Sequence, residues 1–231
     1  SPYLDQFSVD LTQRSKYHHL PLSIGREADL EKIFQILAER SGNLLITGPE
    51  GAGRTTTLHM LAHHMVTEDV PPVLQDKRLV ALETSGLVGS TAPAEQVLIH
   101  VLEEAEHSGN IVLAIEGIDS LARARGAQGL SLLELLVNHL QQSDLVVIAT
   151  STAESYLNVL HNQANFDQVF AHYELQQLDR NAIVRSCCVR ASILESQTKT
   201  LFLYSAIEEA VNLSDRYFKD TAQPQKAIAL L

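Results

Sequence analysis

Short apolar runs alternate with helical patterns along the first three quarters of the chain. The apolar runs predict five strands, at residues 44–47, 79–83, 111–116, 145–150 and, more weakly, 171–175. Apolar residues at helical spacing between these runs predict helices at residues 27–40, 55–66, 93–107, 130–142 and 154–161. Strands that are apolar almost throughout are typical of a parallel sheet with helices on both faces. The pattern therefore predicts an α/β fold.

The strand signal ends near Asp179, and only helical patterns follow, at residues 182–195 and 206–217. We therefore expect three parts. Residues 1–26 form an irregular leader punctuated by prolines, residues 27–176 a large α/β domain, and residues 177–231 a small helical domain.

A glycine-rich segment connects the first predicted strand to the helix that follows it. It keeps the frame of a phosphate-binding loop at Gly48, Gly53 and Thr55, between a buried strand and a helix as such a loop requires. Backbone N–H groups and the helix N-terminus then point at a phosphate. The candidate nucleotide-binding residues here are Gly48, Pro49, Glu50, Gly51, Ala52, Gly53, Arg54, Thr55 and Thr56.

Arg54 occupies the position at which such loops carry a lysine. An arginine keeps the positive charge, but its planar fork does not reproduce a compact ammonium on a flexible stem. The loop thus predicts a nucleotide site, and the arginine in the lysine position raises the question whether that site is still active.

Composition excludes several classes of protein. The chain has 231 residues, is 45% hydrophobic and 19% charged, and carries a formal charge of -11. That balance argues against general binding to nucleic acid or to anionic membranes. The sequence shows neither an apolar run of about 18 residues nor a secretory signal. The adjacent Cys187 and Cys188 suit reduced thiols, so we expect cytoplasm, or an organelle matrix or stroma.

Both ends of the chain resemble one family. Residues 3–12 and the segment Ile24-Gly25-Arg26-Glu27 look like the start of the first ATPase module of the Clp chaperones. Residues 213–217, Pro224 and the run Lys226-Ala227-Ile228 look like that module's helical lid, and the segments between them align with few gaps.

This resemblance implies an AAA+ fold, with a five-stranded parallel sheet followed by an all-helical lid. It also implies ATP or ADP with Mg²⁺ between the two, homo- or hetero-oligomeric rings of Clp-type subunits, and protein clients. Ile24, Gly25, Pro224 and Lys226 join the expected nucleotide contacts, and Thr55 and Glu116 become the expected Mg²⁺ ligands.

The chain departs from the family pattern where the resemblance places hydrolysis. Family members end the third strand with Asp-Glu, whereas this chain has Glu116-Gly117, and Asp119 falls past the site. Gln168 and Val169 occupy the expected arginine-finger positions. Residues 87–93, at the expected pore loop, lack an aromatic residue.

Thr152 takes the position of the residue that senses the γ-phosphate, and an equally good alternative is a simple helix N-cap. His59 and His63 have the i, i+4 spacing of a zinc pair, but no third ligand follows, so surface histidines are the better interpretation.

Three hypotheses follow. The leading one is a degenerate Clp-type module that binds nucleotide, hydrolyses it weakly or not at all, and serves ring assembly or partner docking. The second is an active ATPase whose missing groups come from a partner subunit. The third is a scaffold that binds no nucleotide, in which Arg54 forms an internal ion pair with Glu116 or Glu50.

Overall fold

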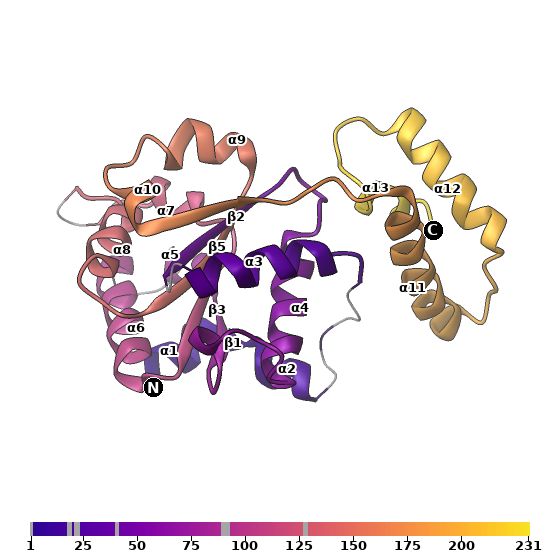
Figure 1. Cartoon of the computed structure of the whole chain (residues 1–231). Coiled ribbons are helices and arrows are strands. Elements are labelled where there is room, and N and C mark those ends of the chain that lie inside the picture. The colour runs from indigo at the N-terminus through magenta and orange to yellow at the C-terminus, as the bar shows by residue number, and fades with distance from the viewer. Residues whose placement is uncertain (1, 18–19, 21–23, 40–41, 89–92, 127–128) are drawn as a thin grey trace.

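The structure is a computed structural model that describes residues 2–17, 20, 24–39, 42–88, 93–126 and 129–231. A twisted sheet with helices on both faces makes up the larger part, and a separate group of helices follows it (Figure 1). This is the predicted α/β architecture with a helical lid.

The sheet has six strands in the order β1-β3-β4-β5-β2-β6. The five predicted strands are all present and pair in parallel: β2 Asn43–Thr47, β3 Arg78–Leu82, β4 Ile111–Ile115, β5 Val146–Ser151 and β6 Phe170–Glu174. Every residue of β2, β4 and β5 is buried, as expected for central strands covered on both sides.

The prediction of an irregular leader is wrong for its described part. Residues 2–16 form α1 Pro2–Phe7, β1 Ser8–Asp10 and α2 Leu11–Lys16. β1 pairs antiparallel with β3 and adds the sixth strand. Leu4, Phe7 and Leu11 are buried in the sheet domain's cores, so this segment is part of that domain's structure.

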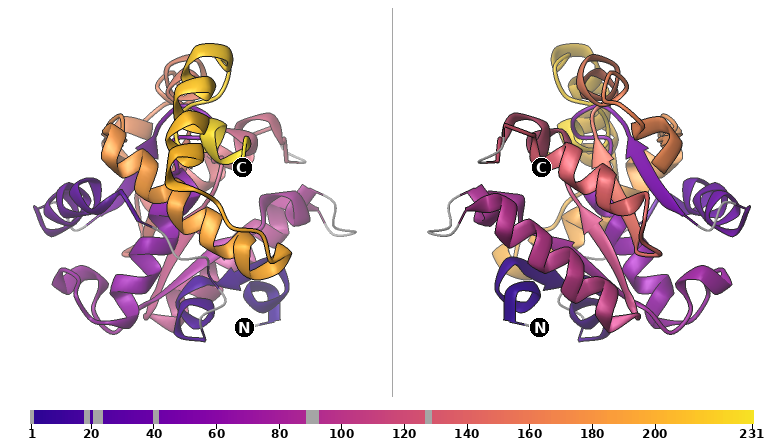
Figure 2. Two further views of the ribbon diagram at one scale, coloured as in Figure 1. Left: turned by 90° about the vertical axis from the view of Figure 1, so that its right-hand side faces the viewer. Right: turned by 90° about the vertical axis from the view of Figure 1, so that its left-hand side faces the viewer.

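Helices cover the two faces of the sheet separately, as the two side views show (Figure 2). One face is covered by α1, α6 Ala94–Ser108, α7 Asp119–Arg123, α8 Leu132–Leu140 and α10 Phe166–Val169. The other is covered by α2, α3 Glu27–Glu39, α4 Arg54–Val66 and the 3₁₀ turn η1 Pro72–Leu74. The remaining short elements are α5 Thr84–Val88, α9 Ala153–Ser155 and the π-helical turn η2 Tyr156–Leu160.

The lid consists of α11 Arg180–Thr198, α12 Tyr204–Tyr217 and α13 Gln225–Ile228. It has its own small core, in which Cys187, Val211 and Ala227 are fully buried. Asp179 caps α11 by accepting a hydrogen bond from the Ala182 N–H at 2.7 Å. The predicted boundary at 176–177 therefore falls in the connection between β6 and α11.

The expected pore loop is only partly described. Leu87 is fully buried at the end of α5, and it therefore belongs to the core of the sheet domain. Residues 89–92 lie outside the described part of the chain.

Candidate nucleotide site

The phosphate loop, residues 48–53, connects β2 to α4 at the carboxyl end of the sheet. Gly51 and Gly53 have φ values of 84° and 96°, a left-handed conformation that strains residues with a Cβ. Gly53 begins α4 without a side-chain cap, so the first N–H groups of the helix stay free for an anion. The loop therefore has the backbone geometry that the sequence motif predicts.

The lid closes directly onto this loop. The Ala222 N–H donates to the Glu50 carbonyl at 2.9 Å. A Cβ added to Gly51 would lie 2.7 Å from Thr221 Cγ2 and 2.9 Å from both the Ala222 oxygen and Gln225 Cβ. Gly51 is thus needed for its conformation and for the close approach of the lid.

A cavity of about 340 Å³ lies beside this contact and brings most predicted phosphate contacts together. Its lining joins the loop and the start of α4 to the lid: Glu50, Gly51, Gly53, Arg54, Thr55, Thr56, Pro224, Gln225 and Ile228. Gly48, the first residue of the loop, is buried, and Pro49 is exposed. The arrangement offers backbone N–H groups, a cation and hydroxyls to a polyphosphate.

A second, mostly apolar cavity of about 150 Å³ adjoins the first on the side of α11. Ile24, Val189, Ile193, Pro224 and Ile228 contribute its apolar walls, and Ala52, Gly53 and Thr56 link it to the loop. Gly25, at φ 94°, lets the chain pass close to α11, where an added Cβ would lie 3.2 Å from Ser186 Oγ. Mostly apolar pockets of this kind suit an aromatic base.

Arg26 is a structural residue of the site that the sequence did not identify. It is 2% exposed and donates to Asp29 Oδ2 at 2.7 Å and to the carbonyls of Ala52 and Gln176, both at 2.5 Å. Asp29 in turn accepts from the Tyr173 hydroxyl at 2.7 Å. This buried network joins the phosphate loop to α3 and to the end of β6.

Thr55 and Glu116, the two expected Mg²⁺ ligands, are in contact with each other. The Thr55 hydroxyl donates to Glu116 Oε2, which joins the start of α4 to the residue after β4. A hydroxyl and a carboxylate are oxygen donors of the kind that Mg²⁺ prefers. The two residues fit a nucleotide-associated Mg²⁺, and their role would be to hold it against the phosphates.

The position after Glu116 has no side chain. Gly117 has φ 60° and donates its N–H to Thr150 Oγ1 at 3.3 Å. The alternative carboxylate, Asp119, accepts from the Ser151 hydroxyl at 2.8 Å and lies 3.8 Å from Arg123. Asp119 is therefore held at the end of β5 by contacts of its own.

The other residues expected to act in hydrolysis have structural surroundings. Thr152 caps α9 by accepting from the Ser155 N–H at 3.0 Å, as in the N-cap alternative, and its sensing role stays a prediction. Gln168 is exposed on α10, and Val169 packs against the core of the sheet domain. Neither residue brings a positive charge to this surface.

Two cations named in the expectations have other surroundings in the structure. Arg54 forms no ion pair with Glu50 or Glu116, all three being described residues, so the internal pair of the scaffold hypothesis is absent. Lys226 does not line the two nucleotide cavities; its ammonium lies 2.8 Å from Asp215 Oδ1 within the lid. That contact holds α13 against the end of α12.

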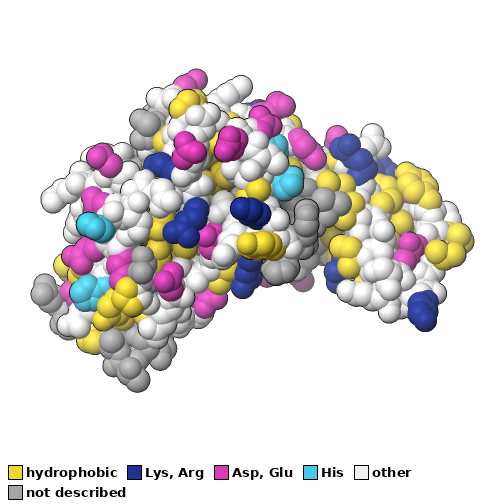
Figure 3. Space-filling view, turned by 90° about the horizontal axis from the view of Figure 1, so that it is seen from below, with side chains coloured by type: hydrophobic (Ala, Val, Ile, Leu, Met, Phe, Trp, Pro, Cys, Tyr) yellow, Lys and Arg dark blue, Asp and Glu magenta, His cyan; other side chains and the backbone are white. Residues whose placement is uncertain are grey.

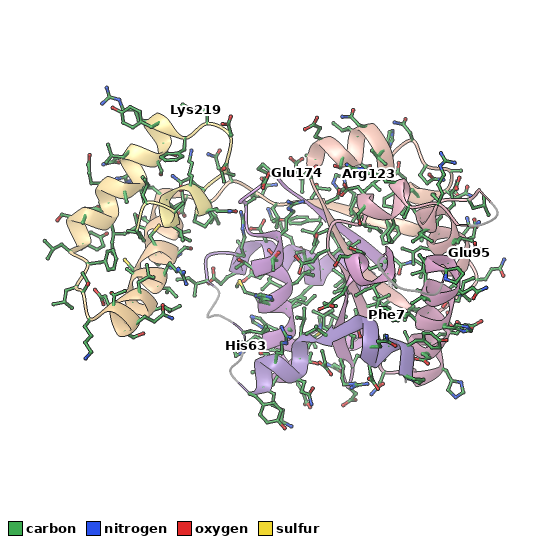
Figure 4. The ribbon with its side chains drawn as sticks, turned by 180° about the vertical axis from the view of Figure 1, so that it is seen from behind. Phe7, His63, Glu95, Arg123, Glu174 and Lys219 are labelled. Atoms are coloured by element: carbon green, nitrogen blue, oxygen red, sulfur yellow. The ribbon has the colours of Figure 1, made fainter. Side chains whose placement is uncertain are left out.

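Lys226 instead borders a third cavity of about 600 Å³ on the other side of the loop–lid contact. Figure 4 labels two of its lining residues, Glu174 on the sheet domain and Lys219 on the lid. The lining is mainly polar and contains carboxylates as well as ammonium groups, so it lacks the character of a base pocket.

His59 lies one helical turn after Thr55 and is half-buried. Burial lowers the pKa of His59, while the charge of Glu116 acts in the opposite direction and that of Arg14 adds to the lowering. His63 does not join it, because its Nδ1 lies 3.4 Å from Ser15 Oγ. Among the residues placed by the structure there is no cluster of three or more His, Cys, Asp or Glu suited to a metal ion.

No helix in the described part of the chain has the length and apolar character needed to cross a membrane.

Comparison with protein families gives two matches on this chain. Residues 44–172 match the model of the ATPase family associated with various cellular activities (AAA), and residues 195–231 match an AAA lid domain. The first match contains the phosphate loop and most of β2 and β6, and the second contains the lid segment that contacts the loop.

Curated relatives align over the whole chain. The chain is 29% identical over 236 residues to the negative regulator of genetic competence ClpC/MecB of Bacillus subtilis. It is 30% identical over 239 residues to the ATP-binding subunit ClpC of the ATP-dependent Clp protease of Staphylococcus aureus. The chain spans only 29% of the length of each of these relatives.

Solved structures of Hsp104 have the same fold. The Saccharomyces cerevisiae Hsp104–ADP complex superposes with a TM-score of 0.88 at 26% identity, covering 99% of this chain and 33% of that chain. The extended Hsp104–casein complex superposes with a TM-score of 0.86 at 26% identity, and the match covers 99% of this chain and 40% of that chain. The chain therefore belongs to the AAA family, carries an AAA lid domain, and is similar over its whole length to one module of the Clp proteins and of Hsp104.

Proposed function

We propose that this module binds ADP or ATP with Mg²⁺ between the phosphate loop and the lid, and that it hydrolyses ATP weakly or not at all. The observation that carries the proposal is the contact of the lid with Gly51 and Glu50 beside the two cavities. Groups from both the sheet domain and the lid would then contact the nucleotide at once. The base would lie against Ile24 and Pro224, and the phosphates against the loop N–H groups and Arg54.

The weak-hydrolysis part depends on the residues at the carboxyl ends of β4 and β5. A general base contributes about 10²–10⁴-fold to a rate, and Gly117 has no group to act as one. A missing arginine finger costs about 10³–10⁵-fold, and Gln168 and Val169 carry no charge. Parts of one site are not additive, yet either loss alone leaves slow turnover.

A role in oligomer assembly or partner docking is supported by the lid surface. Figure 3 shows hydrophobic side chains gathered on the lid. Leu201, Leu203 and Tyr204, in the α11–α12 connection and at the start of α12, are 85%, 71% and 61% exposed. Contiguous exposed apolar surface is typical of interaction sites. We propose that Clp-type subunits, of the same chain or another, contact this surface. We further propose that the resulting assembly handles protein clients and works in cytoplasm or an organelle matrix.

The alternative of an active ATPase is favoured by one observation, the Asp119 carboxylate held at the end of β5 by Ser151. In that case a partner subunit supplies the arginine finger, and Asp119 orients the attacking water. The alternative of a scaffold without nucleotide loses its main support, because Arg54 does not fill the site by pairing with Glu50 or Glu116.

Calorimetric titration with Mg-ADP and Mg-ATP tests binding. We expect heat of binding at sub-millimolar ligand, and no heat at millimolar ligand would refute the binding proposal.

Phosphate release, alone and mixed with a complete Clp partner, then separates the weak and active alternatives. The comparison variant is Arg54→Lys with Gly117→Glu. Since Gly117 has φ 60° with no atom within 4 Å of an added Cβ, Gly117→Ala serves as a control for backbone strain. Wild-type turnover equal to that of the repaired variant would favour the active ATPase.

A further inference from the structure

A further cavity, of about 370 Å³, lies at the end of the sheet opposite the phosphate loop. Its walls come from β1, α2, the end of α4 and the start of β3, and its lining residues are Asp10, Thr12, Gln13, Lys16, Tyr17, Met65, Val66, Lys77 and Arg78. Strands β3, β4, β5 and β2 all run in the same direction, so the amino end of β3 and the loop after β2 are at opposite ends of the sheet. A ligand here would therefore be separate from the candidate nucleotide site.

This basic cavity is positively charged, although the chain as a whole is strongly acidic. Three cations and one carboxylate line it, a formal charge of +2, in a chain whose formal charge is -11. The carboxylate, Asp10, is already engaged within the protein. It accepts from the Thr12 hydroxyl and from the Gln13 N–H at 2.8 Å, which caps α2. Its second oxygen lies 3.2 Å from Arg78 Nη1.

The two lysines of the basic cavity have no such partner. In the described part of the chain, the ammonium groups of Lys16 and Lys77 make neither a hydrogen bond nor an ion pair. Arg78 engages Asp10 through Nη1, and its side chain is 52% exposed. An arginine fork fits a carboxylate, and neighbouring ammonium groups add positive charge around it. The cavity therefore suits an anionic ligand.

The basic cavity also has apolar walls. Tyr17 and Val66 are 60% and 37% exposed, and Met65 is buried beside Val66 at the end of α4. An inorganic anion would leave these walls unused. A peptide that carries an apolar side chain between carboxylates would use both the walls and the cations, as the apolar centre and polar rim of an interface do.

The overall charge of the chain distinguishes short anions from long ones. Nucleic acid or an anionic membrane would also extend over the acidic surroundings and be repelled by them. A short acidic segment responds mainly to the nearby cations, because screening limits charge interactions to about 8–10 Å at ordinary ionic strength. Figure 3 looks at the molecule from below and shows Lys and Arg side chains beside hydrophobic ones on the sheet domain.

We propose that the basic cavity docks an acidic segment of a partner protein, with carboxylates on the three cations and an apolar side chain against Met65 and Val66. This docking surface differs from the exposed apolar surface of the lid, and it does not depend on nucleotide binding.

The two methionines of the chain, Met60 and Met65, allow a direct test. Both lie in α4, but only Met65 lines the basic cavity, so Met60 is an internal control in ¹³C-methyl NMR spectra. The probe is an end-capped peptide in which Leu-Phe is flanked on each side by two glutamates. A second peptide carries glutamines instead. We expect the glutamate peptide to shift the Met65 signal saturably with little change at Met60, and the glutamine peptide to bind at least about 10-fold more weakly.

Charge reversal locates the site. Lys16→Glu/Lys77→Glu should weaken binding of the glutamate peptide about 10-fold or more. Lys32→Glu/Lys199→Glu is the matched control, because it makes the same change in net charge at exposed positions on α3 and after α11. We expect the control to keep the wild-type affinity within about 2-fold. Thermal melts check that both double variants fold.

Several results would overturn the proposal. The absence of a Met65 shift at millimolar glutamate peptide excludes docking, and equal affinity for the two peptides excludes recognition of the carboxylates. An equal loss in the two double variants shows that only net charge matters. Sodium pyrophosphate tests the other source of an anion: if it shifts Met65 at lower concentration than the peptide does, the cavity binds a small anion and the peptide proposal is wrong.

Discussion

The two sides of the candidate site differ in what builds them. The side that would hold a polyphosphate is made largely of backbone: positive-φ glycines, free helix N–H groups and the hydrogen bond from Ala222 to Glu50. The side that would cleave it depends on side chains, and there Gly117, Gln168 and Val169 offer no reactive group. Backbone geometry tolerates exchange of a neighbouring side chain, as Arg54 shows, whereas a missing carboxylate or guanidinium has no backbone substitute.

The largest expected effect comes from removing the anchor of the binding side. Arg26→Ala leaves Asp29 buried without its cation and frees the carbonyls of Ala52 and Gln176. Breaking a buried pair in this way costs about 3–5 kcal/mol of unfolding free energy. Urea unfolding measures the loss. The double variant Arg26→Met/Asp29→Leu should recover part of it, and a loss below about 1 kcal/mol in the single variant would show that the network does not anchor the loop.

Gly51→Ala should separate the lid from the loop. The new Cβ would meet Thr221, Ala222 and Gln225 at under 3 Å. We expect ADP affinity to fall about 100-fold or more, because one closed site becomes two open surfaces. Gly109→Ala is the matched control, since Gly109 also has positive φ, at 70°, but no atom within 4 Å of an added Cβ. Both variants carry the same kind of backbone strain, of about 1–2 kcal/mol. Equal ADP affinities in the two would contradict the importance of the contact.

Removing the cation ligands should have a smaller effect confined to metal-dependent binding. Glu116→Gln and Thr55→Val each delete one donor of the pair joined by their hydrogen bond. We expect roughly 10-fold weaker binding of Mg-ADP, about 1.4 kcal/mol. Binding of ADP in the presence of a chelator should stay unchanged. Equal losses with and without Mg²⁺ would indicate damage to the loop itself.

The smallest expected effect concerns the lid alone. The hydrogen bond from Lys226 is the main cause that lowers the pKa of the Asp215 carboxyl in the folded protein. The pair therefore stabilises the lid above the ordinary Asp pKa of about 3.9 and loses this effect as pH falls through the folded-state value. Since the Asp215 side chain is 53% exposed, we expect the pair to contribute under about 1 kcal/mol to the stability of the lid. The melting temperatures of wild type and Lys226→Met should differ at pH 6 and converge near pH 2. A difference that stays constant with pH would argue against a stabilising role of the Lys226–Asp215 pair.

The sequence predicted the sheet well because its central strands are buried on both faces and read as continuous apolar runs. It missed β1, since Ser8, Val9 and Asp10 are only half-buried and form no such run. α1 and α2, with six residues each, are too short for a periodic signal.

The phosphate loop was predictable because its motif is local in the sequence. The contacts that complete the site join distant residues, and no local pattern reports them. Arg26 reaches Gln176 across 150 positions, and Ala222 reaches Glu50 from the lid. Lys226 is a different case: its ammonium pairs with Asp215 within the lid, and its predicted contact with nucleotide stays a prediction.

Parallel binding and turnover measurements on one preparation of the purified chain test the central claim most directly. The account predicts saturable binding of Mg-ATP together with phosphate release no faster than that of Arg54→Ala. Turnover on the order of 1 s⁻¹ or faster, within the ordinary range of enzymes, that disappears in Glu116→Gln would contradict it.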